Sequence, residues 1–322
     1  MYLQIFYILV NQYVESPPFG RWLREILSGW CECLRGKRVS LREACESISD
    51  GDFLAIGGLT IHRKPMSMLH ELIRLGRRSL RLLVFGGGPD VDLLIASGMV
   101  ESLDAAYVGF EILGFAPNFR SAVERGEIRF TEHTEYSIMA GLQANLLNAE
   151  FIPSRLLLGT DVLKGLGYKT FRSPLTGEVL VAYPRITADV ALLHVQRCDE
   201  YGNARVDGVL AVDLLLAKSS RRVIVTAEKI VSAGDFAGSP AEINLPSTFV
   251  DMVVESPLGA HPTSCYPYYT YDLWHMISYL EYCRRGMVDD YLRKYVTGVE
   301  SFESYLDLVG EDSLSRIMVE GG

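Results

Sequence analysis

Residues 188–205 read ADVALLHVQRCDEYGNAR, and this stretch decides the fold class. Its first six residues form an apolar run that ends where the polar residues begin. A buried strand that leads into a polar cluster is typical of open α/β sheets, because the loops at the carboxyl ends of parallel strands line the ligand crevice. We therefore expect a buried strand here, with a ligand site directly after it.

The segments around this stretch alternate between expected strands and helices. Expected strands cover residues 52–56, 80–85, 105–110, 128–130, 179–182, 188–195, 223–227 and 250–254. Expected helices begin at the capping box Ser40-Leu41-Arg42-Glu43 and cover 66–75, 91–97 and 135–147, with a further helix closing at 122–124. This alternation predicts an α/β fold with an open, mostly parallel sheet covered by helices on both faces.

The composition excludes several classes of function. The chain has 322 residues, a formal net charge of −9 and a sequence pI of about 5.3. A nucleic-acid binder needs a basic face for phosphates, so we expect no nucleic-acid partner. No apolar run reaches the roughly 20 residues of a membrane span, and the apolar start lacks the basic n-region of a signal peptide. We therefore expect no membrane contact.

The cysteines predict a reducing compartment. Their spacing contains neither a C-x-x-C pair nor a zinc-ribbon pattern, which leads us to expect free thiols, a cytoplasmic location and no bound metal. The six cysteines are Cys31, Cys33, Cys45, Cys198, Cys265 and Cys283.

Residues 1–37 differ from the rest of the chain. Trp22, Leu23, Ile26 and Leu27 have the spacing of a short amphipathic helix, and the basic turn Arg35-Gly36-Lys37-Arg38 follows. We interpret residues 1–37 as an N-terminal extension and residues 38–322 as one α/β domain. A start codon placed too far upstream is the alternative, and we expect the extension to be dispensable for catalysis.

Gly-rich turns follow several expected strands. They are Gly57-Gly58, Gly86-Gly87-Gly88 and Gly159-Thr160-Asp161. Glycine lets backbone amides approach a phosphate or thioester oxygen closely, although such residues also serve simply as tight turns. Neither a G-x-G-x-x-G fingerprint nor a Walker A motif is present, so the turns do not predict a dinucleotide or triphosphate site.

Charged side chains add further candidates for the site. Arg63 and Lys64 lie just past the first Gly turn, where two cations could hold phosphates or a carboxylate, or could form a solvated turn. Glu132 and Glu135 are three residues apart at the start of an expected helix that also carries Gln143. The helix dipole alone could account for these carboxylates, or Glu135 could project into the crevice as a base or orienting group.

The polar cluster itself has an expected geometry. His194 and Gln196 alternate with Val195, so both should share one strand face. Asp199 and Asn203 flank a glycine in a turn that these residue types favour. Together they give the pattern His-x-Gln-x-Cys-Asp-x-x-Gly-Asn.

This pattern resembles the signature of family I coenzyme A transferases, and most closely that of the A (alpha) subunits of glutaconate CoA-transferase-like enzymes. Residues 227–231, 257–262 and 271–272 agree with the same family, so the resemblance covers about residues 40–290. Gly57-Gly58, Arg63-Lys64-Pro65 and Gly87-Gly88-Pro89-Asp90 also resemble the alpha chain of a ring-cleaving CoA hydrolase of steroid degradation. In such hydrolases the glutamate six residues before the glycine of Gly-Leu-Gln is a catalytic candidate, and Glu135 holds that place.

The resemblance implies a CoA-transferase fold, a mechanism and a partner. In this family a glutamate of the B (beta) chain attacks the acyl-CoA thioester and forms an anhydride, and CoA thiolate then gives a glutamyl-CoA thioester. This chain lacks a convincing nucleophile motif, so it resembles the partner half. Glu111, after Phe110, is a weaker nucleophile candidate, and we interpret it rather as an acid near a strand end. We expect a B-type partner and CoA as a substrate, without a permanently bound cofactor.

Three functions remain open from the sequence. The first is CoA transfer between carboxylic acids, and the second is hydrolytic opening of a ring in a cyclic oxo-acyl-CoA with Glu135 activating water. The third is a non-catalytic ligand-sensing domain, for which a DNA-binding segment would be expected. The aromatic run at residues 266–271 could line an acyl pocket or, as we expect, pack at a subunit interface.

Overall fold

The computed structural model describes residues 36–319 of the chain. The backbone divides into two compact units, Met1–Lys37 and Arg38–Gly322, and every described helix and strand belongs to the second. Almost all of the expected extension lies outside the described residues, so its separate status stays a prediction.

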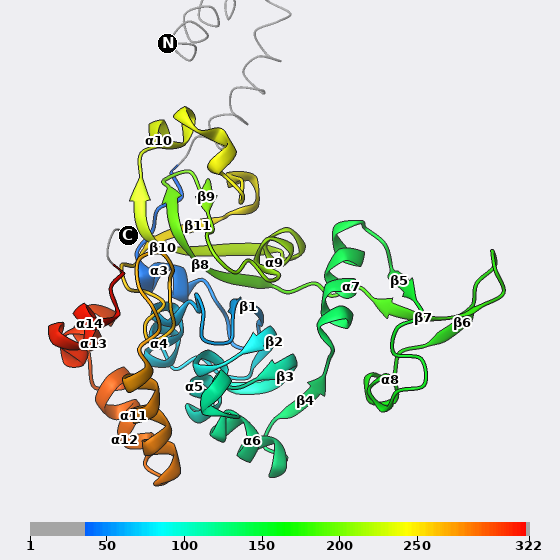
Figure 1. Ribbon diagram of the computed structural model, residues 1–322, viewed down its shortest axis with the longest axis horizontal. Helices are drawn as coiled ribbons and strands as arrows, with labels where there is room; N and C mark the ends of the chain where they lie inside the picture. Colours follow the sequence, from blue (N-terminus) through cyan, green and yellow to red (C-terminus); the bar gives the residue numbers. More distant parts are fainter. Residues whose placement is uncertain (1–35, 320–322) are drawn as a thin grey trace, which may run out of the picture. The chain divides into compact units, whose positions relative to one another are not determined.

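Within the described residues, a main sheet of eight strands forms the centre of the unit. Its strands are β1 (Phe53–Leu59), β2 (Leu80–Gly87), β3 (Val100–Val108), β4 (Arg129–Glu132), β8 (Val190–Asp199), β9 (Ala204–Arg205), β10 (Arg222–Val231) and β11 (Met252–Glu255). They follow the order β11-β10-β8-β1-β2-β3-β4, and all of these neighbours run parallel (Figure 1). The short β9 pairs antiparallel with β8.

Helices connect and cover these strands. They are α3 (Leu41–Glu46), α4 (Met66–Arg74), α5 (Pro89–Ala96), α6 (Pro117–Glu124), α7 (Glu135–Leu146), α8 (Asp161–Leu166), α9 (Asp213–Ser219), α10 (Ala233–Gly238), α11 (Leu273–Arg284), α12 (Val288–Leu292), α13 (Phe302–Val309) and α14 (Glu311–Ile317). Short 3-10 turns occupy Glu111–Leu113, Pro240–Glu242 and Ser247–Phe249, and a π-helical turn occupies Arg293–Thr297. No helix within residues 36–319 combines the length and apolar character that crossing a bilayer requires.

The two faces of the sheet have separate apolar cores. Successive strand side chains point to opposite faces. In β1, Leu54 and Ile56 join a core shared with α4, α5 and the C-terminal helices, whereas Ala55 joins a core shared with α7 and α9. The prediction of an α/β sheet covered on both faces is therefore confirmed.

The chain reverses its direction of strand addition at β1. From β1 it continues to β2 on one side of the sheet, and it later returns to place β8 on the other side. Such a reversal opens a crevice at the carboxyl ends of the strands. β8 is buried along nearly its whole length and ends at Asp199, so the polar stretch singled out in the sequence lies at this crevice.

A second, smaller sheet contains the strand that we expected at residues 179–182. Its strands are β5 (Phe151–Ser154), β6 (Thr170–Arg172) and β7 (Val179–Pro184), which pair antiparallel in the order β5-β7-β6. Residues 179–182 do form a strand, but not one of the parallel sheet. Val181 and Tyr183 are buried while their neighbours are half-buried or exposed, and this alternation is typical of antiparallel strands with one solvated face.

The C-terminal helices α11–α14 were not anticipated from the sequence pattern. Tyr279 of α11, Tyr291 of α12 and Tyr305 of α13 are buried in the core that includes α4 and α5, whereas Ile317 of α14 packs in a smaller cluster with Tyr269. Tyr279 OH donates a hydrogen bond to Asp92 Oδ2 at 2.7 Å, which ties α11 to α5. These helices therefore belong to the same packed unit as the main sheet.

Candidate active site

A buried hydrogen-bonded network links the middle of β8 to the neighbouring strand β10. His194 is fully buried, with Nδ1 at 2.8 Å from Thr226 Oγ1 and Nε2 at 2.7 Å from Glu228 Oε1. The hydroxyl of Tyr269 donates to the same carboxylate oxygen, and the amide of Leu258 donates to Glu228 Oε2 at 2.7 Å. Both oxygens of Glu228 are therefore engaged, so this carboxylate organises the crevice floor.

Glu228 is a site residue that sequence reasoning did not single out. It lies two residues beyond Thr226, on the strand that pairs with β8. The available signal was its place at the end of the apolar run 223–227, since polar groups at strand ends line the crevice.

The same network contains three potential metal ligands, the side chains of His194, Glu228 and Cys265, with ligand atoms within 4.8 Å of one another. Burial raises the pKa of the Cys265 thiol well above its usual value, and the charge of Glu228 raises it further. A protonated thiol is a poor metal ligand, and His194 and Glu228 already hydrogen-bond to each other. The contacts favour a hydrogen-bonded floor over a metal centre.

Gln196 connects two loops that line the crevice. Its Oε1 accepts the amide of Asp207 at 2.9 Å, and its Nε2 donates to the carbonyls of Asp207, at 3.2 Å, and of Tyr266. The side chain is almost fully buried, so it holds these loops in register from beneath. Its expected contact with a ligand stays a prediction.

Asn203 closes the turn between β8 and β9. Asp199 Oδ1 accepts the amides of Tyr201, at 3.0 Å, and Asn203, at 2.9 Å, while Asp199 Oδ2 accepts Asn203 Nδ2 at 2.7 Å. Asn203 Oδ1 accepts the amide of Ser247 at 3.1 Å. These contacts give Asn203 a structural task, and its role toward a ligand stays a prediction.

Arg63 and Lys64 are buried in internal ion pairs. Arg63 is 3% exposed, and its Nη2 lies 2.8 Å from Asp213 Oδ2. Lys64 is fully buried, and its Nζ lies 3.0 Å from Asp90 Oδ2. Breaking such pairs leaves an uncompensated buried charge, which costs about 3–5 kcal/mol. The geometry therefore favours a scaffolding role, and the expected binding of phosphates or a carboxylate stays a prediction.

The glycines in the turns after β1 and β2 allow neighbouring segments of this chain to pack closely against them. Gly58 has φ of +74°, and its amide donates to Asp213 Oδ1 at 2.7 Å. The amide of Gly88 donates to Asp90 Oδ1 at 2.6 Å, and a Cβ added at Gly88 would lie 2.5 Å from Thr60 O. A Cβ at Gly57, Gly86 or Gly87 would also meet neighbouring side chains. The backbone amides of Gly58 and Gly88, which we considered as donors to a ligand, thus already donate to carboxylates of the protein.

A second cluster of polar groups lies at the ends of β1 and β3. The hydroxyl of Thr60 donates to Glu111 Oε1, and both residues have positive φ, at 48° and 53°. Residues held in this region cost about 1–3 kcal/mol each and concentrate at functional sites. Glu111 is exposed, whereas Thr60 is buried, so the carboxylate reaches from the crevice rim over the end of β2.

A cavity of about 310 Å³ opens in the crevice between these elements. Its walls are the turn at residues 62–63, the loop at 207–209 and residues from 264 to 271. Tyr269 is fully buried in the wall, whereas Tyr266 is 62% exposed. His62 Nδ1 lies 2.6 Å from Ser264 Oγ, and burial lowers the pKa of His62 despite the charge of Glu111. The aromatic run thus lines a pocket, and its expected place at a subunit interface stays a prediction.

Glu132, Glu135 and Gln143 lie apart from this network. Glu132 ends the edge strand β4, Glu135 begins α7, and all three side chains are exposed. Four strand spacings separate β8, which carries His194, from β4, or about 19 Å. The structure therefore places Glu132 and Glu135 at the carboxyl ends of the strands but away from His194, whereas Gln143 lies in the last turn of α7, towards the amino end of β10.

Comparison with known proteins adds independent findings. A sequence profile described as coenzyme A transferase matches residues 38–256. An uncharacterised protein of Archaeoglobus fulgidus is 37% identical over 300 residues, which cover 92% of this chain and 66% of that protein. The chain therefore spans just under two thirds of the length of that relative.

Two further relatives have described activities. The cholesterol ring-cleaving hydrolase IpdA subunit of Rhodococcus jostii is 35% identical over 71% of this chain and 81% of its own length. The A-type subunit of glutaconate CoA-transferase from Acidaminococcus fermentans is 28% identical over 89% of this chain and 96% of its own length. The crystal structure of that transferase superimposes with a TM-score of 0.85, covering 89% of this chain.

Proposed function

Because this chain belongs to the coenzyme A transferase family, we propose that it is the alpha subunit of a two-chain enzyme that moves CoA between carboxylic acids. The observation that carries the proposal is the similarity to the A-type subunit of a glutaconate CoA-transferase along nearly the whole length of that protein, together with the crevice at the β1–β8 reversal. The chemistry of the crevice is consistent with one half of such a site.

The proposed reaction places the nucleophile on a partner beta chain. A glutamate of that chain attacks the acyl-CoA carbonyl, which forms a mixed anhydride and releases CoA thiolate. The thiolate attacks the glutamyl carbonyl, which releases the first acid and leaves a glutamyl-CoA thioester. The carboxylate of the second acid then reverses these steps and departs as the new acyl-CoA. Glu228 makes three hydrogen bonds within this chain, which supports a nucleophile from outside it.

This chain would supply the wall of the acyl pocket. The cavity at residues 62–63, 207–209 and 264–271 is lined by tyrosine side chains, and one of them, Tyr269, also belongs to the hydrogen-bonded network of His194 and Glu228. Gln196 holds two of these loops together, so the network would keep the pocket in one shape during transfer. CoA would enter as a substrate, and no resident cofactor is part of the proposal.

Exposed apolar side chains on strand-end loops support a partner at this edge. Ile112 is 87% exposed and Phe115 is 71% exposed, both in the loop that follows β3. Val209 and Leu210 are also exposed beside the cavity. Apolar side chains gathered in this way are typical of protein interfaces. A beta chain that covered them would complete the crevice and exclude water from it.

Hydrolysis of a cyclic oxo-acyl-CoA is the second candidate function. It is favoured by the 35% identity to one chain of a cholesterol ring-cleaving hydrolase and by the exposed Glu135 at the start of α7. In that case Glu135 would activate a water molecule, and the partner would not need a nucleophilic glutamate.

The test uses the full chain, alone and co-purified with the product of the neighbouring reading frame. We expect turnover of acyl-CoA only in the two-chain complex. After incubation with acyl-CoA, borohydride should reduce a glutamyl-CoA thioester, and mass spectrometry should place the product on the partner. Modification of Glu111 or Glu135 would overturn the assignment of roles. Hydrolysed product without modification of either chain would establish the hydrolase.

A further inference from the structure

A second cavity, of about 380 Å³, lies between the start of α11 and the helix α14. It is distinct from the crevice cavity, but Thr270 and Tyr271 line both. The amide of Thr270 donates to the carbonyl of Ile317 at 2.8 Å, which joins the dividing segment to α14. An occupant of the second cavity would therefore contact a wall of the crevice.

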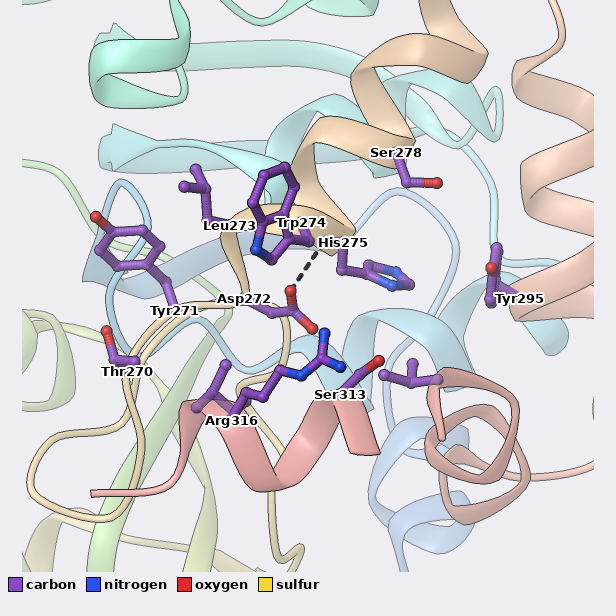
Figure 2. Close-up of a pocket in the computed structure, with 12 residues that line it drawn as sticks. Thr270, Tyr271, Asp272, Leu273, Trp274, His275, Ser278, Tyr295, Ser313 and Arg316 are labelled. Carbon is purple, nitrogen blue, oxygen red and sulfur yellow. Dashed lines mark hydrogen bonds between the residues drawn. The ribbon is translucent and has the colours of Figure 1, made fainter. Parts of the chain in front are cut away.

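Several polar groups face this cavity without partners in the protein. Figure 2 shows the Arg316 side chain extending from α14 toward Asp272 and His275. Among residues 36–319, the Arg316 guanidinium has no ion pair, and the hydroxyls of Ser278 and Ser313 have no hydrogen-bond partner. A guanidinium and two hydroxyls around one cavity form a donor set suited to a carboxylate.

The floor of the cavity carries one negative charge. Asp272 Oδ2 lies 3.1 Å from His261 Nε2, and Asp272 Oδ1 accepts the amide of His275 at 2.9 Å. Burial alone would raise the pKa of Asp272, but these hydrogen bonds outweigh it and lower that pKa, so the side chain is a carboxylate. Burial lowers the pKa of His275 to about 3, so its imidazole is neutral. Asp272 would repel a dianion in the cavity about twice as strongly as a monoanion, whose single charge Arg316 can balance.

We propose that this cavity binds a small monocarboxylate with a short apolar tail, with Arg316 holding the carboxylate. The apolar side chains of Leu273, Trp274, Val309 and Ile317 also line the cavity and would contact the tail. The volume lies at the lower end of the range for small-molecule sites, which fits a compact ligand. The site is independent of acyl-CoA chemistry in the crevice.

The test is a fluorescence titration of the full-length chain with butyrate. The tryptophans are Trp22, Trp30 and Trp274, and Trp274 is 71% exposed in the cavity wall. In a Trp22→Phe/Trp30→Phe background, Trp274 is the sole source of tryptophan emission, and the Arg316 variants assign any response to this cavity rather than to the neighbouring one that Trp274 also lines. We expect a saturable change with butyrate and at least about tenfold weaker binding after Arg316→Gln, because a charge-assisted pair is lost. The affinity of Arg316→Lys for butyrate should lie between those of the parent and of Arg316→Gln, because lysine keeps the charge but lacks the planar guanidinium.

Matched variants and a second ligand separate the alternatives. Arg120→Gln removes an exposed arginine of α6 that pairs with Glu124, and it should bind butyrate like the parent. Tyr266→Ala alters the crevice cavity and should also leave the titration unchanged. The proposal would be overturned by no saturable change, by a response that survives Arg316→Gln, by loss of binding in Tyr266→Ala, or by equal binding of inorganic phosphate. The titration needs neither acyl-CoA nor the partner, so its outcome does not depend on the proposed transferase activity.

Discussion

Three glutamates, Glu228, Glu111 and Glu135, differ in how many hydrogen bonds their carboxylates make within the protein. Glu228 receives three hydrogen bonds and is buried among them. Glu111 receives one, from the hydroxyl of Thr60. Glu135 is exposed at the start of α7, and within residues 36–319 it takes part in no ion pair. A carboxylate that forms no ion pair within the protein is free to meet a substrate, and the catalytic role of Glu135 stays a prediction.

We expect Glu135→Gln to lower kcat of the two-chain enzyme by about 10²–10⁴-fold if Glu135 acts as a general base. The loss of its interaction with the helix dipole should cost less than about 1 kcal/mol, so the free energy of unfolding should barely change. Steady-state kinetics and urea denaturation measure the two effects. Glu311→Gln is the matched control, because Glu311 is an exposed glutamate that begins α14 away from the crevice. Equal kcat for both variants would leave Glu135 with a purely structural role.

At the scale of elements, the turns after β1 and β2 interlock. The amide of Thr60 donates to Gly86 O at 2.9 Å, and the backbone of Thr60 leaves no room for a side chain at Gly88. This contact holds the β1 turn beneath Glu111 and beside the crevice cavity. The Gly-rich sequence at the end of β2 is therefore explained by packing between two turns.

Gly88→Ala tests this packing. We expect it to lower the free energy of unfolding by about 1–3 kcal/mol, because the new Cβ would lie 2.5 Å from Thr60 O. Gly165→Ala is the control, since Gly165 lies in α8 with nothing within 4 Å of an added Cβ. It should stabilise the protein by about 0.5–1 kcal/mol through helix propensity. Urea denaturation measures the free energy of unfolding of both variants. Equal changes in the two variants would contradict the close packing between the turns after β1 and β2.

At the scale of the whole molecule, buried histidines make stability depend on pH. Burial lowers the pKa of His70, His261 and His275, and His70 lies beneath the C-terminal helices against Phe302 and Tyr305. Both ring nitrogens of His70 lack a hydrogen-bond partner. These histidines stay neutral in the folded protein, whereas in the unfolded chain they take up protons as the pH falls below about 6.5.

The free energy of unfolding should therefore fall as the pH is lowered from about 7.5 to 5. For His275, a folded pKa of about 3 against 6.5 unfolded corresponds to a loss of about 2 kcal/mol at pH 5. His70→Leu should flatten this slope and keep or raise stability at pH 8, because it removes an unsatisfied polar ring. Urea denaturation between pH 5 and 8 provides the measurement. An unchanged slope would show that His70 does not contribute to it.

The sequence by itself determined the class of fold and indicated the edge of the sheet where the candidate site lies. The strand that begins at Val190, the Gly-rich ends of β1 and β2 and the helix from Glu135 to Leu146 all follow from local patterns. Apolar runs, capping residues and turn residues act within a few positions of one another, so they can be interpreted before the chain is folded. The family resemblance carried by residues 194–203 rests on the same kind of local pattern.

Only the tertiary structure decided which polar groups meet. Glu228 is 34 residues from His194 and 41 from Tyr269, and nothing local signals their shared hydrogen bonds. Arg63 is buried because Asp213, 150 residues away, supplies a matching charge. The antiparallel pairing of β7 and the separation of Glu135 from the His194 network likewise depend on distant segments. Burial and ion pairing are properties of neighbours in space, and sequence spacing does not encode them.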